Sequence, residues 1–445
     1  MRSNEEDLGS WSLRMPQKRS NRARSIRLNQ HIYDFPQRPV VAICIDGCDP
    51  AYIKQGLSDG ILPHIQRFLH SGFGAWADAA IPTFTNPNNL SIVTGSPPAV
   101  HGIAGNYFLD PKTGQAVMMT DPAQLRSDTL LARFSQAGAK VVVITAKDKL
   151  CRLLGHGLRP GMCFSAEKAA GCTYEQHGIE DVCDHIGLPQ PHVYSADLSL
   201  FVLEAGLALL EQHRPDLMYL SLSDYVQHKH APGSTEANTF YQALDRLCGR
   251  FADAGAVVAL TADHGMNAKP RIVFLQDILD DHFSTGKIRV ICPITDPYVV
   301  HHGALGSFVR VYCPDIDQAA VRTVIRSIPG IEAVYDKQTA CEEFHLPLDR
   351  EADLVVLGDQ HTALGAAERD HDLSGLEDAP LRSHGGRAEQ SVPFMLSEPV
   401  SDDYRKRAET TRLRNFDLFD YALNGVCLSS DSIVSSRLVS LKPSL

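Results

Sequence analysis

The segment PVVAICIDG, residues 39–47, is an apolar run rich in β-branched residues that ends in Asp46 and Gly47. Strands of this kind, apolar on both faces, are typical of parallel sheets that helices cover on both sides. The closing Asp-Gly pair indicates that the strand brings a carboxylate to its carboxyl end. We therefore expect an α/β protein with a buried strand at this position.

Three further segments repeat the pattern of an apolar run closed by polar residues. They are KVVVITAKDK at 140–149, DLMYLSLSD at 216–224 and AVVALTADHG at 256–265. The segments that precede them have helical periodicity and span 127–138, 200–213 and 239–255. Strands that alternate with helices form βαβ units, so the sequence predicts a mainly parallel sheet sandwiched by helices.

The pattern changes between residues 268 and 378, where shorter strand-like runs surround a helix-like segment. We predict that 268–378 is a smaller α+β cap insertion, and that 39–267 and 379–445 together form the core. The first 38 residues are polar and Arg-rich, without the apolar stretch of a secretory signal. They predict a disordered basic leader, residues 1–38, with Met15 as an alternative natural start.

Composition excludes several classes of protein. The chain of 445 residues has 42 Lys and Arg against 53 Asp and Glu, a net charge of −11, whereas general nucleic-acid binders are usually basic. It contains no run of about 18 apolar residues, so we expect no membrane span. Its 11 cysteines are scattered without a CxxC motif, which is typical of reduced thiols in a cytoplasmic protein.

The predicted strand ends carry charged groups, and parallel α/β sheets bind their ligands beyond the carboxyl ends of the strands. These groups are Asp46, Lys147, Lys149, Asp224, Asp263 and His264. Any one of them alone is well explained as a solvated strand end. Their shared position at one edge of the sheet favours a common site.

Several of these residues have the spacing of metal ligands. Asp224 and His228 are four residues apart, so in a helical turn their side chains face the same way and can bind one ion. Asp263 and His264 are neighbours and converge only in an irregular loop, which a following glycine permits. His384 precedes two glycines in another predicted loop. Together they predict two bound metal ions of the zinc type.

Other histidines receive a plainer interpretation. His230 is a rival ligand, but it lies two residues from His228 and is expected to face solvent. His101, His301 and His302 have no carboxylate partner in the pattern, and we expect no metal-binding role for them.

The segment PTFTNPNNLSIVTGSPPAVHGIAGN, residues 82–106, places the Thr85 hydroxyl just before a short apolar helix. We expect this helix to begin near Pro87 and to end at Gly95. Contact with a metal ion lowers the pKa of a hydroxyl, and the N-terminus of a helix favours a phosphoryl group. Thr85 is therefore a candidate nucleophile, with a simple N-cap as the alternative.

Taken together, these residues resemble the alkaline phosphatase superfamily, especially its nucleotide pyrophosphatase/phosphodiesterase-like branch. The shared features are Asp46 after the first strand, TNPN with its Thr, TGSPPAVHGI at 94–103, D-x-x-x-H, D-H-G and a late H-G. Within that branch the chain is similar to the phosphonoacetate hydrolase family. That similarity lies in TAKDKL at 145–150, in HDLSGLEDAPLRSHGGRAEQSVPF at 371–394, and in Asn106.

The resemblance implies an alkaline phosphatase-like core that binds two Zn²⁺ and hydrolyses the C–P bond of phosphonoacetate. A phosphothreonine on Thr85 would be the intermediate, and acetate and phosphate the products. It implies one zinc site formed by Asp46, Thr85, Asp263 and His264, and another formed by Asp224, His228 and His384. It implies a substrate site formed by Thr85, Asn106, Lys147, Lys149 and His228, with the lysine pair on the carboxylate. Strand alternation would point both lysines to one side.

Three alternatives stay open at this stage. The first is a two-zinc phosphodiesterase or nucleotide pyrophosphatase with the same Thr nucleophile, in which Phe84 or Tyr107 would contact the base. The lysine pair disfavours it, because a nucleoside leaving group has no carboxylate. The second is a zinc-binding scaffold without turnover. The third, a sulfatase, lacks the required C/S-x-P-x-R context. The resemblance implies a small-molecule phosphonate as partner, and the sequence indicates no oligomeric state.

Overall fold

The computed structural model describes residues 25–376 and 380–427, and its largest sheet has seven strands. The strand of the opening segment, β3, lies in the middle of this sheet. In spatial order the strands are β4 (Phe73–Asp78), β19 (Ser391–Leu396), β10 (Val257–Thr261), β3 (Val40–Cys44), β9 (Leu217–Ser221), β7 (Val141–Thr145) and β8 (Met162–Ser165). All four predicted strands are therefore found in one sheet.

The pairing of these strands explains where the polar residues meet. β10, β3, β9, β7 and β8 are parallel neighbours, whereas β19 pairs antiparallel with both β10 and β4. Residues that follow β3, β9, β10 and β7 consequently lie at one edge of the sheet. The mainly parallel α/β fold predicted from the sequence is confirmed.

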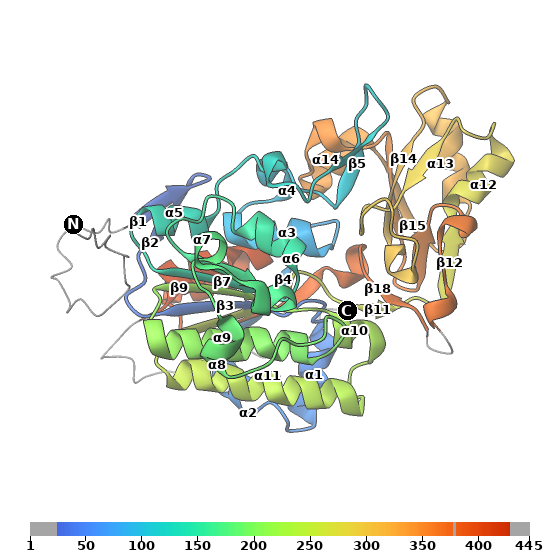
Figure 1. Ribbon diagram of the computed structural model, residues 1–445. Helices are drawn as coiled ribbons and strands as arrows, with labels where there is room; N and C mark the ends of the chain where they lie inside the picture. The colour runs from blue at the N-terminus through green and yellow to red at the C-terminus, as the bar shows by residue number, and fades with distance from the viewer. Residues whose placement is uncertain (1–24, 377–379, 428–445) are drawn as a thin grey trace, which may run out of the picture.

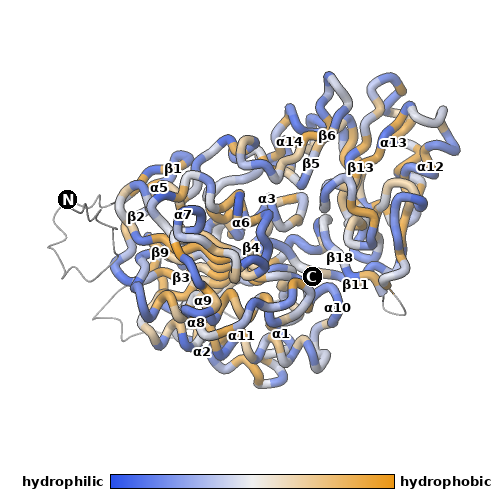
Figure 2. Tube along the Cα trace, in the orientation of Figure 1, coloured by the Kyte–Doolittle hydropathy of each residue, from blue (hydrophilic) through white to orange (hydrophobic). Residues whose placement is uncertain are grey.

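Helices cover both faces of the central sheet (Figure 1). On one face lie α1 (Pro50–Ser58), α2 (Pro63–Ser71), α9 (Asp197–His213) and α11 (Thr235–Asp253). On the other lie α3 (Thr85–Thr94), α5 (Leu130–Gln136) and α6 (Asp148–Leu154). The strands between these layers are buried, and Figure 2 shows their apolar residues as the hydrophobic centre of the molecule.

The chain between β10 and β19 forms a second body beside the core (Figure 1). Its antiparallel sheet has the order β13 (Arg289–Ile291), β14 (Phe308–Tyr312), β16 (Leu354–Gly358) and β15 (Ile331–Asp336). It also contains β12 (Arg271–Phe274), α12 (Leu275–His282), α13 (Gln318–Arg326), α14 (Lys337–Phe344) and β17 (Thr362–Gly365). A separate apolar cluster lies between this sheet, α12 and α13. The limits of a cap at 268 and 378 stay a prediction.

Two short strands join the core to this second body. β11 (Asn267–Ala268) leads into it and β18 (Arg382–Ser383) leads out of it, and the two pair antiparallel. This pairing brings the loop after β10 beside the loop after β18, although the two loops are far apart in the sequence. The predicted ligands Asp263, His264 and His384 are carried by these two loops.

The smaller elements complete the core. They are the hairpin of β5 (Tyr107–Leu109) and β6 (Ala116–Met118), and the helices α4 (Pro98–His101), α7 (Tyr174–His177), α8 (Val182–Ile186), α10 (Tyr225–Lys229), α15 (Asp402–Thr410) and α16 (Leu418–Asp420). Among residues 25–376 and 380–427, no helix combines the length and the apolar character needed to cross a membrane.

The prediction of a disordered leader over residues 1–38 is wrong for its final part. β1 (Ser25–Leu28) and β2 (His31–Asp34) form an antiparallel hairpin. Ile26, Leu28 and Tyr33 are buried and belong to the main apolar cluster, which accounts for the order of this segment. Residues 1–24, with the alternative start Met15, lie outside the described part of the chain.

Candidate active site

Thr85 is the first residue of α3. Phe84 occupies the N-cap position with an extended backbone, and its carbonyl accepts the first helical hydrogen bond from Asn88 N–H at 3.2 Å. The helix therefore begins two residues before the predicted Pro87, whereas it ends as predicted at Gly95, whose φ of 60° is left-handed. Since Thr85 is inside the helix, the N-cap alternative is wrong. Its hydroxyl is free for another role.

Asp46, Asp263 and His264 form a buried cluster beside the Thr85 hydroxyl. His264 Nε2 lies 3.3 Å from Thr85 Oγ1, 3.3 Å from an Asp46 oxygen and 3.9 Å from an Asp263 oxygen. Asp46 follows β3, and the Asp-His pair follows the neighbouring strand β10. The parallel pairing of these strands thus produces the cluster. One ligand atom from each of the three residues lies within 4.8 Å of the others.

A second cluster consists of Asp224, His228 and His384. Asp224 occupies the N-cap position of α10 and His228 lies one turn later, which places His228 Nε2 2.8 Å from Asp224 Oδ2. His384 comes from the loop after β18. Its ring stacks on that of His264, with centroids 3.6 Å apart and planes 9° from parallel. The two clusters are therefore adjacent, as a two-metal site requires.

Backbone carbonyls orient the three imidazoles. The Nδ1 atoms of His228, His264 and His384 lie 2.8, 2.9 and 2.7 Å from the carbonyl oxygens of Arg382, Gly265 and Thr83. Each Nδ1 can therefore donate its proton outward, which leaves Nε2 as a lone-pair donor facing the clusters. Metal-binding histidines in proteins are held in this way.

The charges of the two clusters fit a divalent cation. In the described part of the chain, Asp46 Oδ1 is buried without a hydrogen-bond partner. Burial, together with Asp224 and Asp263, raises the pKa of Asp46 well above its usual range. Burial also raises the pKa of Asp263. Cations at these atoms would satisfy the orphan oxygen and reverse both shifts, and His and Asp together are ligands that zinc accepts.

The pair of Asp224 and His228 supports the same conclusion. An unprotonated Nε2 and a carboxylate oxygen at 2.8 Å repel each other unless a proton or a cation lies between them. Burial tends to lower the pKa of His228, but Asp224 outweighs it and the pKa is raised. Burial likewise acts to raise the pKa of Asp224, but His228 and two further histidines hold it below its usual range.

Asn89 orients Asp263, a role that the sequence analysis missed. Its Nδ2 donates to Asp263 Oδ2 at 3.1 Å and to the Thr85 carbonyl at 3.0 Å. Its Oδ1 accepts from Tyr219 O–H at 2.8 Å and from Ser221 O–H at 2.9 Å. The signal was present in the run TNPNN, where Asn89 lies one helical turn after Thr85, so the two share a face.

Three of the predicted substrate residues lie outside the two clusters and Thr85: Lys147 and Lys149 at the start of α6, and Asn106 just before β5. β7 ends at Thr145, Lys147 occupies the N-cap position of α6, and Lys149 lies in the first turn of that helix. The strand-alternation argument for the lysine pair is therefore wrong, because neither residue is in the strand. Lys149 Nζ pairs instead with Asp296, and Lys147 Nζ lies 5.2 Å from the centroid of the Tyr194 ring.

Asn106 is linked to the first turn of α3. Its Oδ1 accepts from Asn86 Nδ2 at 2.8 Å, and Asn86 directly follows Thr85 in the chain. Its Nδ2 donates to Asp296 Oδ1 at 3.2 Å, so Asn106 and Lys149 share one carboxylate. Asp296 belongs to the second body, and no motif in the sequence indicated it.

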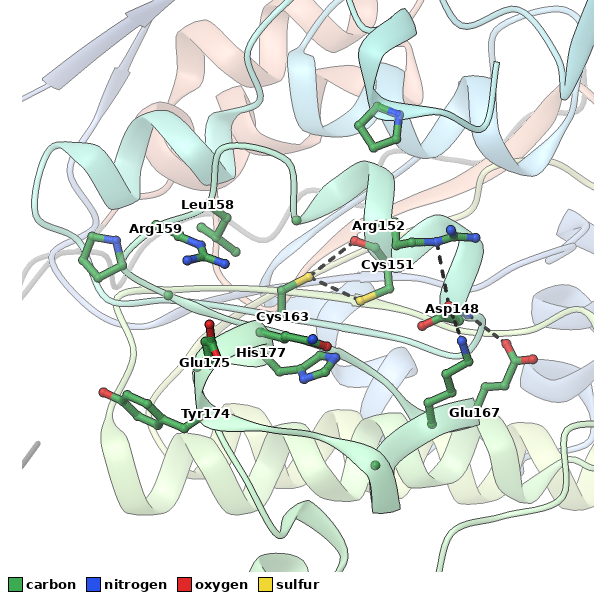
Figure 3. A pocket seen from close by; sticks show the side chains of 18 of the residues that line it. Asp148, Cys151, Arg152, Leu158, Arg159, Cys163, Glu167, Tyr174, Glu175 and His177 are labelled. Carbon is green, nitrogen blue, oxygen red and sulfur yellow. Dashed lines mark hydrogen bonds and ion pairs between the residues drawn. The ribbon is translucent and has the colours of Figure 1, made fainter. Parts of the chain in front are cut away.

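The other side of α6 faces a cavity of about 940 Å³ (Figure 3). Asp148 from α6 pairs there with Lys168 at 2.8 Å, and its N–H donates to Glu167 at 2.8 Å. Cys151 and Cys163 bring their sulfur atoms to 3.4 Å (Figure 3). The predicted site residues, all within the described part, do not line this cavity. These contacts instead fix the helix that carries Lys149.

Two of the remaining histidines, His230 and His101, lie away from both clusters. His230 lies outside both clusters and 3.7 Å from Glu236. His101 is fully buried beside Ser91 Oγ at 2.9 Å, and burial lowers its pKa to about 3.

A buried ion pair lies between the two loops that carry the predicted metal ligands His264 and His384. Lys269 Nζ lies 2.7 Å from Glu389 Oε1, and both side chains are fully buried. The second oxygen of Glu389 accepts from Gly386 N–H at 3.1 Å, and its carbonyl accepts from Gly265 N–H at 2.7 Å. Glu389 is therefore bonded to the loop of His264 and to the loop of His384.

We expect Lys269→Met to lower the free energy of unfolding by about 3–5 kcal/mol, because it leaves the Glu389 charge buried and unpaired. Urea unfolding followed by circular dichroism measures this loss. The matched control is Arg67→Met, which breaks an exposed pair with Asp253 and should cost about 1 kcal/mol or less. Equal losses in the two variants would contradict a special role for the buried pair.

Comparison with known proteins gives consistent relatives. A profile of the family described as type I phosphodiesterase / nucleotide pyrophosphatase matches residues 40–387. Crystal structures of phosphonoacetate hydrolase from Sinorhizobium meliloti 1021, in complex with phosphonoacetate and with phosphonoformate, superpose with a TM-score of 0.87. That protein is 47% identical, and the match covers 91% of this chain and 99% of that chain.

Curated sequences give shorter or weaker matches. A phosphonoacetate hydrolase sequence of Penicillium oxalicum is 53% identical over 57 residues, which is 12% of this chain and 79% of that sequence. An uncharacterized pyrophosphatase/phosphodiesterase of Schizosaccharomyces pombe is 25% identical over 283 residues, 59% of this chain. The match covers 54% of that protein, so the chain spans about half the length of this relative.

Proposed function

Since the chain belongs to the type I phosphodiesterase/nucleotide pyrophosphatase family and, within it, to the phosphonoacetate hydrolases, we propose that it hydrolyses the C–P bond of phosphonoacetate to acetate and phosphate. The observation that carries this proposal is a composite site at one sheet edge. The hydroxyl of Thr85 lies against one carboxylate–imidazole cluster, and a second such cluster adjoins the first. Lys149 reaches the neighbouring Asn106 network through Asp296.

Two Zn²⁺ ions are the proposed cofactors. Asp46, Thr85, Asp263 and His264 would hold one, and Asp224, His228 and His384 the other. When bound, zinc supplies Lewis acidity that offsets the charge of the phosphonate and lowers the pKa of the Thr85 hydroxyl. The outward hydrogen bonds of the histidines and the contact of Asn89 with Asp263 keep the ligand atoms in place for this role.

Thr85 is the proposed nucleophile. Its hydroxyl would lose its proton and its oxygen would form a bond to phosphorus while the C–P bond breaks. This gives a phosphothreonine and a carbanion, which takes up a proton to become acetate. The free N–H groups in the first turn of α3 favour the phosphoryl anion beside it. Water would then cleave the phosphothreonine and release phosphate. Asn106, held next to this turn through Asn86, can donate a hydrogen bond to a phosphoryl oxygen that gains charge.

The proposed role of the lysines is to stabilise the leaving group. Carbon is a poor leaving group, but the electron pair of the broken bond can spread into the adjacent carboxylate of acetate. Lys147 and Lys149 at the start of α6 would stabilise this negative charge. His228, which lies 2.8 Å from Asp224, is expected to face the substrate as well.

For the nucleotide phosphodiesterase alternative, the two aromatic residues proposed to contact a base are buried, but two other aromatic residues are exposed beside the lysines. Phe84 and Tyr107, the aromatic residues expected to contact a base, are both buried in apolar clusters. Tyr194 and Tyr298 are exposed beside Lys147 and Lys149, and either ring offers a face for stacking. Substrate preference therefore has to decide between the two activities.

The deciding experiment measures product release by zinc-loaded protein from three substrates: phosphonoacetate, a phosphonate without a carboxylate, and a nitrophenyl phosphodiester. We expect rapid phosphate release from phosphonoacetate alone. Faster hydrolysis of the diester would overturn the phosphonoacetate assignment while leaving the nucleophile and metal clusters in place.

The lysine pair allows a sharper test of the same proposal. We expect Lys147→Met and Lys149→Met each to reduce kcat/KM for phosphonoacetate by about 10- to 100-fold, because a charged hydrogen bond to the substrate is lost. Turnover of a phosphate ester without a carboxylate should change little. Lys112→Met, on the exposed β5–β6 hairpin, is the control. Equal losses on both substrates would assign the lysines to the fold.

A further inference from the structure

Asp296 is a buried carboxylate that the second body extends toward the proposed substrate site. It follows β13, and its side chain is only 1% exposed. Its Oδ1 accepts from Asn106 Nδ2 at 3.2 Å, and its Oδ2 accepts from Lys149 Nζ and from Tyr298 O–H. One carboxylate thus connects two substrate-binding candidates that come from different parts of the core.

We propose that Asp296 is a positioning residue that holds Lys149 and Asn106 for a phosphonate bearing a single carboxylate. This inference rests on the proposed function. It assigns to the second body one wall of the substrate site, so the core alone does not complete the site.

The contacts of Asn106 leave its amide little choice of orientation. Asn86 donates to its Oδ1 and Asp296 accepts from its Nδ2, so the planar amide is held at both ends. A carboxylate accepts hydrogen bonds only, which prevents the amide from turning over. The second Nδ2 hydrogen remains for a ligand. Held in this way, Asn106 can meet a phosphoryl oxygen without first reorganising.

The side chain of Lys149 depends even more on such contacts than that of Asn106. Its side chain is 48% exposed, and a free lysine side chain of that exposure samples many rotamers. Asp296 and the Tyr298 hydroxyl, which lies 3.4 Å from Nζ, occupy two of its three N–H donors. The third donor remains for a substrate carboxylate. Asp296 also offsets one of the two lysine charges, which suits a monocarboxylate better than a group of higher charge.

The backbone around Asn106 is clamped by the same body. Asn106 N–H donates to the Pro293 carbonyl at 2.8 Å, three residues before Asp296. Arg310 from β14 donates to the Ala104 carbonyl at 3.0 Å, and its guanidinium pairs with Glu351 in a fully buried contact. Gly105, with φ of 153°, permits this approach, since a Cβ there would lie 3.1 Å from the Pro293 oxygen. The contact of Asp296 with Asn106 is thus part of a fixed interface.

A different role for Asp296, competition with the substrate for Lys149, predicts the opposite effect on KM. If the carboxylate merely occupied Lys149 and competed with the substrate, its removal would release the ammonium and lower KM. If Asp296 instead positions Lys149, an asparagine at this site places an amide N–H against the donors of Lys149 and Asn106. Both side chains then lose their fixed positions. Asp296→Asn distinguishes the two, because the side chains have nearly the same shape.

The experiment compares zinc-loaded wild type with Asp296→Asn on phosphonoacetate and on a phosphate ester without a carboxylate. We expect kcat/KM for phosphonoacetate to fall about 10- to 100-fold, with a smaller fall on the ester through Asn106 alone. When Lys149 is already replaced by Met, adding Asp296→Asn should reduce kcat/KM for phosphonoacetate only as much as it reduces kcat/KM for the ester. Asp281→Asn, an exposed carboxylate on α12, is the control.

Two further measurements keep the inference separate from the proposed function and from folding. Calorimetric binding of phosphonoacetate to zinc-loaded Thr85→Ala should weaken at least about 10-fold when Asp296→Asn is added. Tyr298→Phe, which keeps the ring but removes the hydroxyl, should show a smaller loss of the same kind, even if Asp296→Asn unfolds. Unchanged or tighter binding would overturn the role of Asp296. Lack of phosphonoacetate turnover by the wild type would instead overturn the proposed function.

Discussion

Replacing Thr85 by alanine is expected to reduce kcat for phosphonoacetate by about 10⁴-fold, because the residual site binds the substrate but offers no nucleophile. The Thr85 hydroxyl lies 3.3 Å from His264 Nε2 at the start of α3, so its removal leaves both carboxylate–imidazole clusters in place. Phosphate release in steady state measures the loss. Mass spectrometry of wild type quenched with acid during turnover should detect a phosphate on Thr85.

The control is Thr85→Ser, which keeps a hydroxyl at the same atom and should retain measurable turnover. Zinc content and thermal midpoint are measured for both variants, so that loss of metal is separated from loss of the nucleophile. An alanine variant with full activity would remove Thr85 from the mechanism. If the protein with Thr85→Ala keeps the biological role of the wild type, a zinc-binding scaffold without turnover becomes the better interpretation of this protein.

Removal of the metal ions is expected to abolish turnover and to lower the thermal midpoint. Three buried or half-buried carboxylates, Asp46, Asp224 and Asp263, share the site with three imidazoles, and among residues 25–376 and 380–427 Asp46 Oδ1 has no hydrogen-bond partner. An ion that binds only the folded state stabilises it by about 4 kcal/mol at a thousandfold excess over its Kd. Dialysis against a chelator, followed by activity measurement and differential scanning calorimetry, tests this. Added zinc should restore both properties.

Metal stoichiometry gives this prediction its control. Asp46→Asn should lower the zinc content from two ions per chain toward one, because it alters the cluster of Asp263 and His264 alone. Asp148→Asn, on the cavity side of α6, changes a carboxylate outside both clusters and should leave the content unchanged. Protein that binds no zinc in elemental analysis, or that keeps its activity after chelation, would contradict the proposed cofactor.

The sequence by itself determined four of the seven strands of the central sheet and the residues at their carboxyl ends. The four apolar runs that form β3, β7, β9 and β10 are local patterns, and a buried parallel strand needs no distant information to be recognised. The spacing of Asp224 and His228 on one helical turn is also local. Motif spacing likewise placed Asp46, Thr85, Asp263, His264 and His384 in one predicted site, and the structure brings all of them together.

Only the tertiary structure decided how those residues are held and what completes the site. His384 donates to the Thr83 carbonyl across 301 residues of sequence, and its ring stacks on His264 through the pairing of β11 with β18. Asp296 contacts Lys149 across 147 residues and Asn106 across 190. Side-chain contacts of this range arise from the packing of separate elements, and no local periodicity encodes them. For the same reason the hairpin of residues 25–34 was missed, because its order depends on a distant apolar core.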